Sequence, residues 1–312
     1  MGLSRPQQVR GRILWSYAIP IVGLHALALL ALVPWLFSWT GLILMLVGVH
    51  VFGQGINIGY HRLLTHRSFR AAKWVERGFV LLALCCLEDT PARWTANHRY
   101  HHKHSDEEPD PHSPLVSFLW SHVGWLMFKN EAMHTVSAYQ KYAPDILKDP
   151  FYFKLEKHQL LAPLIYLGHA AVFFLVGVIL GYATAGGGTS AWAAGLQFGL
   201  SLLVWGVVVR TVVVWHITWA VNSLTHLFGY RNYDSDEHST NNWLVALVTV
   251  GEGWHNNHHH DPASASNQHK WWELDLSFYE IKLLEKLGVA DKVKPPRHER
   301  QRRGNAAQRE QA

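Results

Sequence analysis

The chain has 312 residues, of which 49% are hydrophobic and 16% are charged, and its formal net charge is +5. The charged fraction lies well below the roughly 25% of a typical soluble domain, which argues against an ordinary soluble globular protein. The only two cysteines are adjacent and exclude a disulfide framework; no nucleic-acid motif is visible, so the basic charge indicates membrane topology and contact with anionic lipid.

Two long stretches of the sequence carry no charge. No Asp, Glu, Lys or Arg occurs between Arg12 and Arg62, or between Lys157 and Arg210. Each stretch of about 50 residues can hold two membrane-spanning helices of about 20 residues and a turn. The sequence therefore predicts four transmembrane helices in two hairpins, at 14–36, 39–60, 158–182 and 190–214. The fourth helix is expected to continue toward residue 228.

The basic residues predict which side of the membrane the polar segments occupy. Arg and Lys lie in the first 12 residues, after the second predicted helix and in the C-terminal tail, whereas the turns within the hairpins hold none. Cytoplasmic segments carry the excess of Lys and Arg, so both termini are predicted to be cytoplasmic. The chain is then divided into a basic N-terminus (1–12), one membrane-embedded domain (13–290) and a basic tail (291–312). The tail is expected to be disordered.

The polar segments 61–157 and 229–290 are predicted to form a helical cap on the cytoplasmic side. Two apolar stretches near Trp74 and Trp120 are too short to span a membrane, so we expect helices at the membrane interface there. Trp120 and Trp125 suit that boundary, where tryptophan is enriched. The predicted fold class is an all-α integral membrane protein with four transmembrane helices and a cytoplasmic cap.

Histidines gather in four short clusters beside the predicted transmembrane helices. The clusters read H-R-L-L-T-H, H-R-Y-H-H, N-S-L-T-H and H-N-N-H-H. Imidazole is the commonest metal ligand in proteins, and positions i, i+3 and i+4 share one face of a helix. The sequence therefore predicts a metal site whose candidate ligands are His61, His66, His98, His101, His102, Asn222, His226, His255, His258 and His259.

The number of histidines predicts two metal ions. Nine imidazoles are too many for one ion, so we expect four or five ligands for each, with Asn222 holding a ligand position or a bound water. Each H-x-x-H-H cluster can present three imidazoles together. His61 and His66 are about 140° apart on an α-helix, so we expect them to serve different ions unless the helix ends between them. The spacing leaves the metal open, because imidazole suits Zn, Cu, Fe and Ni alike.

The other histidines are given ordinary structural roles. Single histidines within apolar or polar segments are interpreted as core or interface residues, namely His25, His50, His134, His158 and His169. Histidines near the clusters are interpreted as surface residues or as neighbours of the ligands, namely His104, His112, His216 and His260.

At the cluster residues, the chain resembles the membrane-bound fatty acid desaturases, specifically their Δ9 acyl desaturase branch. G-Y-H-R-L-L-T-H-R-S-F (59–69), H-R-Y-H-H-K-H-S-D (98–106) with D-P-H-S (110–113), and E-G-W-H-N-N-H-H (252–259) are similar to the three histidine boxes of that family. V-N-S-L-T-H-L-F-G-Y-R (221–231) is similar to the segment that supplies one more histidine and a water-holding asparagine. The resemblance covers roughly residues 40–290.

The resemblance implies a di-iron centre that uses O2 to place a cis double bond, expected at Δ9, in a saturated acyl chain. It implies that the nine histidines are iron ligands and that Asn222 acts through water, with no separate acid or base assigned. Electrons would come from an external ferredoxin or cytochrome b5-type donor, since no haem, flavin or Fe–S motif is visible. The expected location is a bacterial inner membrane, with the active site on the cytoplasmic side.

An apolar substrate channel should end beside the metals and exclude water. Trp94, Trp219 and Trp254 lie close to the boxes and are candidate walls of that channel, with ordinary packing as an equal alternative. Where animal acyl-CoA desaturases carry an Arg-Asp pair, this chain has Ala96 and Asn97. The acyl carrier, coenzyme A or a glycerolipid, therefore stays open at this point.

Two other functions compete with desaturation. One is an alkane or sterol hydroxylase, which uses a similar all-histidine site. The other is a zinc-binding membrane transporter or receptor. Transporters place ionisable ligands within their spans, whereas the clusters here lie at the ends of the predicted helices, which favours an enzyme.

Overall fold

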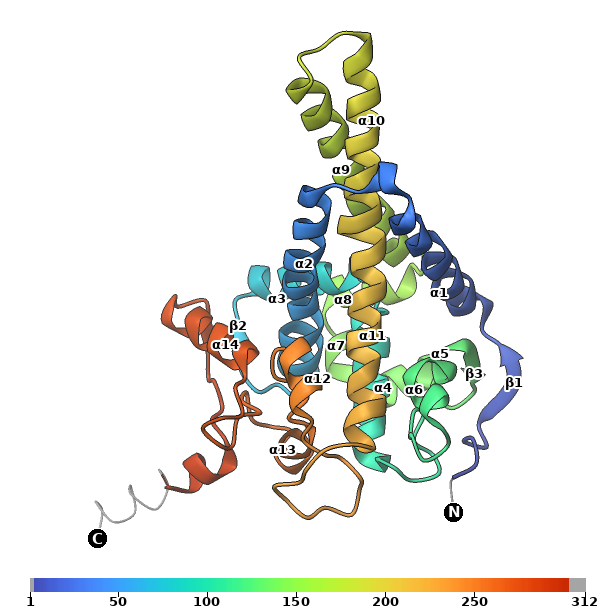
Figure 1. Ribbon diagram of the computed structural model, residues 1–312. Coiled ribbons are helices and arrows are strands. Elements are labelled where there is room, and N and C mark those ends of the chain that lie inside the picture. The colour runs from blue at the N-terminus through green and yellow to red at the C-terminus, as the bar shows by residue number, and fades with distance from the viewer. Residues whose placement is uncertain (1–2, 303–312) are drawn as a thin grey trace.

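The computed structural model describes residues 3–302 and is predominantly helical, with long helices extending from a group of shorter ones (Figure 1). Four helices among these residues are long and apolar enough to cross a membrane, as the sequence predicts. They are Trp15–Leu32, Trp39–Thr65, Leu161–Thr184 and Thr189–His226. The first is shorter than predicted because the chain turns at Pro34, and the second continues past residue 60 to Thr65.

The long helices change their hydrogen-bonding pattern along their length. The first joins α1 (Trp15–Ala28) to the 3-10 helix η1 (Leu29–Leu32), and a second 3-10 turn, η2 (Pro34–Leu36), follows. The second joins α2 (Trp39–Gln54) to a π-helix, η3 (Gly55–Thr65). The third is α9 (Leu161–Thr184). The fourth runs through α10 (Thr189–Leu203), the π-helix η5 (Val204–Val209), α11 (Arg210–Ser223) and the 3-10 helix η6 (Leu224–His226).

Helices α9 and α10 form a closely packed hairpin at one end of the molecule (Figure 1). Gly177 and Gly181 of α9 face Gly195 and Gly199 of α10, and a Cβ on Gly177 would lie 2.7 Å from the Cα of Gly199. Small residues four apart let the two backbones approach this closely. The helices of the other pair diverge from the turn that joins them, and α1 packs against η5 and the cap helix α5 (Trp125–Met127).

Short helices make up the rest of the described chain. Between the second and third long helices lie α3 (Lys73–Leu84), α4 (Pro91–His104), the π-helix η4 (Trp120–Gly124), α5, α6 (Val136–Tyr142), α7 (Pro144–Leu147) and α8 (Pro150–Lys157). After the fourth lie α12 (Trp243–Val248), α13 (His255–His260) and α14 (Leu276–Lys286). Helix α4 begins at Thr90, whose hydroxyl accepts a hydrogen bond from the backbone N–H of Arg93.

The interface interpretation of Trp120 is wrong. Its side chain is buried, and its indole N–H donates to the carbonyl of Pro111 at 3.1 Å. A buried indole needs such a partner, and here it anchors η4 to the loop after α4. Trp74, in contrast, is 71% exposed.

Two short antiparallel pairs of strands tie distant segments together. Strand β1 (Val9–Ile13) pairs with β3 (Phe128–Asn130), and β2 (Arg70–Ala71) pairs with β4 (Ala290–Asp291). Past β4, the backbone N–H of Lys294 donates to Ser68, and Arg300 contacts Asp261. The first part of the predicted disordered tail therefore packs on the cap, while 303–312 lie outside the described residues.

Candidate metal centre

Nine histidines converge into two neighbouring groups, each of which can hold a metal ion. The first group contains five imidazoles, from His61, His66, His98, His102 and His258. The second contains four, from His101, His226, His255 and His259. In each group the nitrogen atoms that would bind an ion lie within 4.8 Å of one another. The division into five and four matches the number of ligands that the sequence predicts for two ions.

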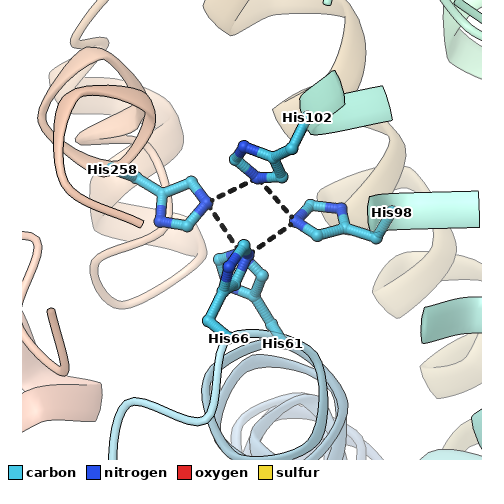
Figure 2. Close-up of side chains that lie close together, drawn as sticks. All are labelled: His61, His66, His98, His102 and His258. Carbon is cyan, nitrogen blue, oxygen red and sulfur yellow. Dashed lines mark hydrogen bonds between the residues drawn. The ribbon is translucent and has the colours of Figure 1, made fainter. Parts of the chain in front are cut away.

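The five imidazoles of the first group point toward one another from η3, α4 and α13 (Figure 2). Their Nε2 atoms form a continuous series of contacts at 3.0 to 3.1 Å, in the order His61, His258, His102, His98 and His66. Each contact would need its own N–H proton, and neighbours in the series cannot both carry one. Each Nε2 offers either one proton or one lone pair, so at most two of the four contacts can be hydrogen bonds, whereas a cation could accept every lone pair at once.

The second group contains buried nitrogens that have no hydrogen-bond partner in the described protein. The Nε2 atoms of His101 and His226 are of this kind, and those of His255 and His259 lie 3.0 Å apart. An unsatisfied buried polar atom is costly and calls for an explanation. A metal ion at the centre of the group would supply the missing partner, so the donor set of both groups fits a bound metal.

Carboxylates hold the outer nitrogens of several of these rings. Asp110 contacts Nδ1 of His101 at 3.0 Å, and Asp106 contacts Nδ1 of His226 at 2.8 Å. Glu252 makes the same contact with His61 at 2.8 Å. A carboxylate at Nδ1 fixes the tautomer that leaves Nε2 free to bind a metal.

The electrostatics of the first group favour neutral imidazoles. Burial and the neighbouring rings hold the pKa values of His98, His102 and His258 well below the usual value. A neutral ring keeps the lone pair that a metal requires. Burial would raise the pKa of Asp110, but the adjacent rings of His101 and His112 hold it below its usual value, so this carboxylate stays charged.

Of the two alternatives that the sequence leaves open for His61 and His66, the structure shows the second: the helix ends between them, at Thr65, and both residues belong to the first group. They lie at the end of the π-helix η3, and the backbone N–H of His66 donates to the carbonyl of His61, five residues earlier. This i to i+5 pattern widens the helix. Five residues then make little more than one turn, and the two rings point to the same side.

The H-x-x-H-H clusters each contribute to both groups. His98 and His102 of α4 join the first group, while His101, between them, joins the second. On α13, His258 joins the first group, and His255 and His259 join the second. The three imidazoles of a cluster therefore bridge the two groups instead of gathering around one ion.

Asn222 and His112 lie beside the two groups. The side chain of Asn222 lines the adjoining cavity, and its backbone carbonyl accepts a hydrogen bond from Ser121. His112 packs on His101 with 4.3 Å between the ring centres, and its backbone N–H donates to Asp110 and closes a turn. Burial and His101 lower the pKa of His112 to about 3, so the ring is neutral.

A cavity of about 590 Å³ extends from the histidine groups between the long helices. Its lining is mostly apolar and includes Trp94 and Trp219, as the sequence suggests, together with Trp125 and Trp215. Trp254 is not among the lining residues. It is buried, and its indole N–H donates to the carbonyl of Leu274.

The cavity reaches the surface between the first turns of α1 and α9. Ser16 on α1 and Gln159, Leu160 and Leu167 at the start of α9 both line the cavity and are exposed. Leu160 is 74% exposed and Leu167 is 60% exposed. The entrance therefore lies between two long apolar helices.

The cavity contains an acidic side chain that sequence reasoning missed. Glu88 lines it, and the Oε1 atom of Glu88 is buried without a hydrogen-bond partner in the described protein. Burial raises the pKa of Glu88 to about 8, and hydrogen bonds from Trp94 and Thr218 oppose that rise. The carboxyl group is therefore neutral at pH 7, which an apolar cavity requires.

The carboxylates beside the histidines were also missed. Asp106 and Asp110 stand within H-S-D and D-P-H-S, and Glu252 stands three residues before His255. Acidic residues so close to candidate ligands were the available signal, since a ligating histidine needs a partner for its second nitrogen.

Comparisons with known proteins bear on these residues. A family model described as fatty acid desaturase matches residues 33–287. An sn-1 stearoyl-lipid 9-desaturase of Anabaena variabilis is 41% identical over 282 residues, covering 90% of this chain and 93% of the relative. An sn-2 palmitoyl-lipid 9-desaturase of Nostoc sp. (strain 36) is 40% identical, covering 86% of each. An acyl-CoA 5-desaturase of Anemone leveillei is 40% identical, covering 90% of this chain and 79% of the relative.

Proposed function

The chain belongs to the fatty acid desaturase family and is a fatty acyl desaturase, and on this premise we propose that it introduces a cis Δ9 double bond into a saturated acyl chain at a di-iron centre. The nine histidines of the two groups would hold the two irons, and Asn222 would act through a water molecule. The observation that carries this proposal is the pair of buried imidazole groups at the inner end of an apolar cavity.

Two irons bound here would supply O2-dependent oxidation of an unactivated methylene, which no side chain can perform. The residues of the chain supply position and environment. Asp106, Asp110 and Glu252 hold the imidazoles in the ligating tautomer. Trp94 and Trp219 form walls that hold the acyl chain beside the histidines and exclude water.

The carrier we propose is a glycerolipid. An entrance between α1 and α9 suits an acyl chain that arrives from the bilayer while its headgroup stays at the interface. Ala96 is fully buried and Asn97 nearly so, which leaves no cationic surface at these positions for a nucleotide phosphate. The names of the two cyanobacterial relatives, which act on stearoyl-lipid and palmitoyl-lipid, support the same carrier.

The remaining parts of the proposal concern location and electron supply. We place the protein in a bacterial inner membrane, with both termini, the cap and the histidine groups on the cytoplasmic side, because Lys and Arg gather in those segments. A ferredoxin or cytochrome b5-type protein would deliver electrons one at a time to the cap.

The test is expression in a host that lacks Δ9 desaturation, followed by mass spectrometry that locates double bonds separately in the lipid and acyl-CoA fractions. We expect Δ9 alkenes to appear first in lipid, and about two irons per purified chain. Alkenes that appear first in acyl-CoA would overturn the carrier. A hydroxylated chain without an alkene would support the hydroxylase, and stoichiometric zinc without O2 consumption would support a transporter or receptor.

A further inference from the structure

A row of three histidines lies outside the two metal groups, where α1, η4 and α11 meet. Nε2 of His25 contacts Nε2 of His216 at 3.0 Å, and Nδ1 of His216 contacts Nε2 of His122 at 3.0 Å. The row continues from Nδ1 of His122 to the hydroxyl of Ser223 at 2.9 Å. At its other end, Nδ1 of His25 contacts the carbonyl of Ile21 at 2.7 Å.

The geometry of this row differs from that of a metal site. In the metal groups the rings turn their nitrogens toward one centre, whereas His216 engages its neighbours through opposite nitrogens. An ion between His25 and His216 would have no third imidazole within reach. The arrangement is that of a chain of hydrogen bonds, which imidazole is suited to form because each ring has a nitrogen on either side.

The row has two hydrogen-bonded states that differ by one proton. Its four contacts need four protons, and three neutral imidazoles supply three. Ser223 contributes the fourth if its hydroxyl turns to His122, but the hydroxyl also lies 3.0 Å from the carbonyl of Trp219. If Ser223 donates to Trp219, the row needs one extra proton. Gain of a proton by the row and rotation of one hydroxyl are therefore linked.

The two ends of the row lie in different surroundings. His216 is exposed on the outer face of α11, while Ser223 is fully buried. Ser223 directly follows Asn222 within the N-S-L-T-H segment, and η4 contacts this part of α11 through both Ser121 and His122. Ionisable side chains in membrane-spanning helices are costly and indicate a function. The row thus runs from an exposed ring on α11 to a buried hydroxyl whose neighbour in sequence, Asn222, lines the cavity.

We propose that His25, His216, His122 and Ser223 form a proton relay that serves the oxidation site. The inference rests on the proposed function, because desaturation consumes protons in a site that excludes water. One O2, two electrons from the donor protein, two protons and the two hydrogens removed from the acyl chain give two molecules of water. Histidine is the common proton shuttle in proteins, and these residues supply the protons.

The side chains that pack on the three histidines of the row are aromatic, and none of them fixes the charge of a ring by pairing with it. His25 packs on Trp215 and Trp219, and His122 packs on Phe118 and Trp219. Among the described residues, no carboxylate, Lys or Arg forms an ion pair or a hydrogen bond with these three rings. Burial and the neighbouring His216 lower the pKa of His122 to about 4, so the inner part of the row is neutral at rest and passes protons without storing them.

The decisive variant is His216→Ala, with His50→Gln as the matched control. His50 is also a histidine of a long helix, but it pairs with Glu280 outside the row. In iron-loaded enzyme we expect His216→Ala to lower kcat by at least about tenfold, with unchanged KM and iron content. The solvent deuterium isotope effect on kcat should rise, and added imidazole should restore part of the rate.

A second readout needs no metal. In metal-free protein labelled with 15N-histidine, the imidazole signals of His25 and His122 should titrate together, and His216→Ala should abolish this coupling. Independent titration in the parent protein would overturn the relay, whether or not the protein makes an alkene. So would a His216→Ala enzyme whose kcat and isotope effect stay within about twofold of the parent. If His216→Ala does not fold, His122→Asn gives the same test of kcat and of the solvent isotope effect.

Discussion

The Nε2 atoms of His61 and His258 lie 3.0 Å apart, although 197 positions separate these residues in the sequence. His61 ends the second long helix and His258 lies on α13, after the fourth. Neither group of imidazoles exists until both halves of the chain have folded together. Metal binding should therefore depend on the whole fold, and the fold should in turn be stabilised by the metal.

His102→Ala should abolish desaturation and lower the iron content. His102 contacts both His98 and His258, so its loss interrupts the first group at its middle. Metal analysis of the purified variant, together with alkene yield in a host without Δ9 activity, measures both effects. Full turnover by the variant would show that the proposed ligand set is wrong.

The control for that variant is His158→Ala. His158 is exposed at the end of α8, and the sequence already assigns it no ligand role. Activity and iron content should stay at the parent level. His169 would be a poorer control, because its ring lies 2.8 Å from the fully buried guanidinium of Arg210.

Glu252→Gln should weaken iron binding without removing a ligand. Glu252 contacts Nδ1 of His61 and pairs with the buried Arg62, which also pairs with Asp275. Loss of a carboxylate behind a ligating histidine typically lowers metal affinity by about 10 to 100-fold. Removing one partner of a buried ion pair costs about 3–5 kcal/mol of stability. Iron titration and denaturant unfolding measure the two effects separately.

The matched control for Glu252 is Glu285→Gln. Glu285 pairs with Lys282 on the exposed side of α14, where both side chains are solvated. Such a surface pair contributes at most about 1 kcal/mol. If both variants lose the same stability, the buried network around Arg62 is not what holds His61.

Glu88 predicts a loss of activity in alkaline solution. Because burial raises its pKa to about 8, the carboxyl is neutral below that pH and charged above it. A charge in the apolar cavity opposes entry of an acyl chain, so kcat/KM should fall as the pH rises through about 8. The Glu88→Gln side chain stays neutral at every pH, so the alkaline fall of kcat/KM should move to higher pH in this variant.

The free energy of unfolding should also depend on the protonation of Glu88. The folded state keeps the proton of Glu88 up to about pH 8, whereas an unperturbed carboxyl loses it near 4.5. Between these values the folded state binds more protons than the unfolded state, so this group makes stability fall as pH rises. Glu88→Gln removes that contribution, and an unfolding series across this range should show a smaller decline. An unchanged slope would mean that Glu88 is ionised in the cavity.

The ligands and the long helices were predictable from the sequence because their signals are local. Two uncharged stretches indicate four spans, and imidazoles at H-x-x-H-H spacing indicate a metal site. The common orientation of His61 and His66 was not predictable, since it depends on a π-helix that no residue type specifies. The contact of Asp106 with His226 joins residues 120 positions apart, so only the folded chain brings that carboxylate to its histidine.

The sequence predicted an apolar cavity beside the histidines, but it did not predict all of the residues that line it. Trp94 and Trp219 follow from their places beside the histidine boxes, whereas Trp125 and Trp215 line it because η4, which leads into α5, packs against α11. Trp254 stands in the third box, yet its indole turns toward the carbonyl of Leu274. Nearness in sequence to a ligand does not decide which way a large side chain points.

Gly177→Leu should separate the α9–α10 hairpin. A Cβ at this position meets the Cα of Gly199 at 2.7 Å, and both atoms belong to backbone or its direct substituent, so neither can move without displacing a helix. Gly168→Leu is the matched control on the same helix, because a Cβ there meets nothing within 4 Å. Thermal unfolding in detergent should show a lower midpoint for Gly177→Leu alone. Equal midpoints for the two variants would mean that close contact between these glycines does not hold the hairpin together.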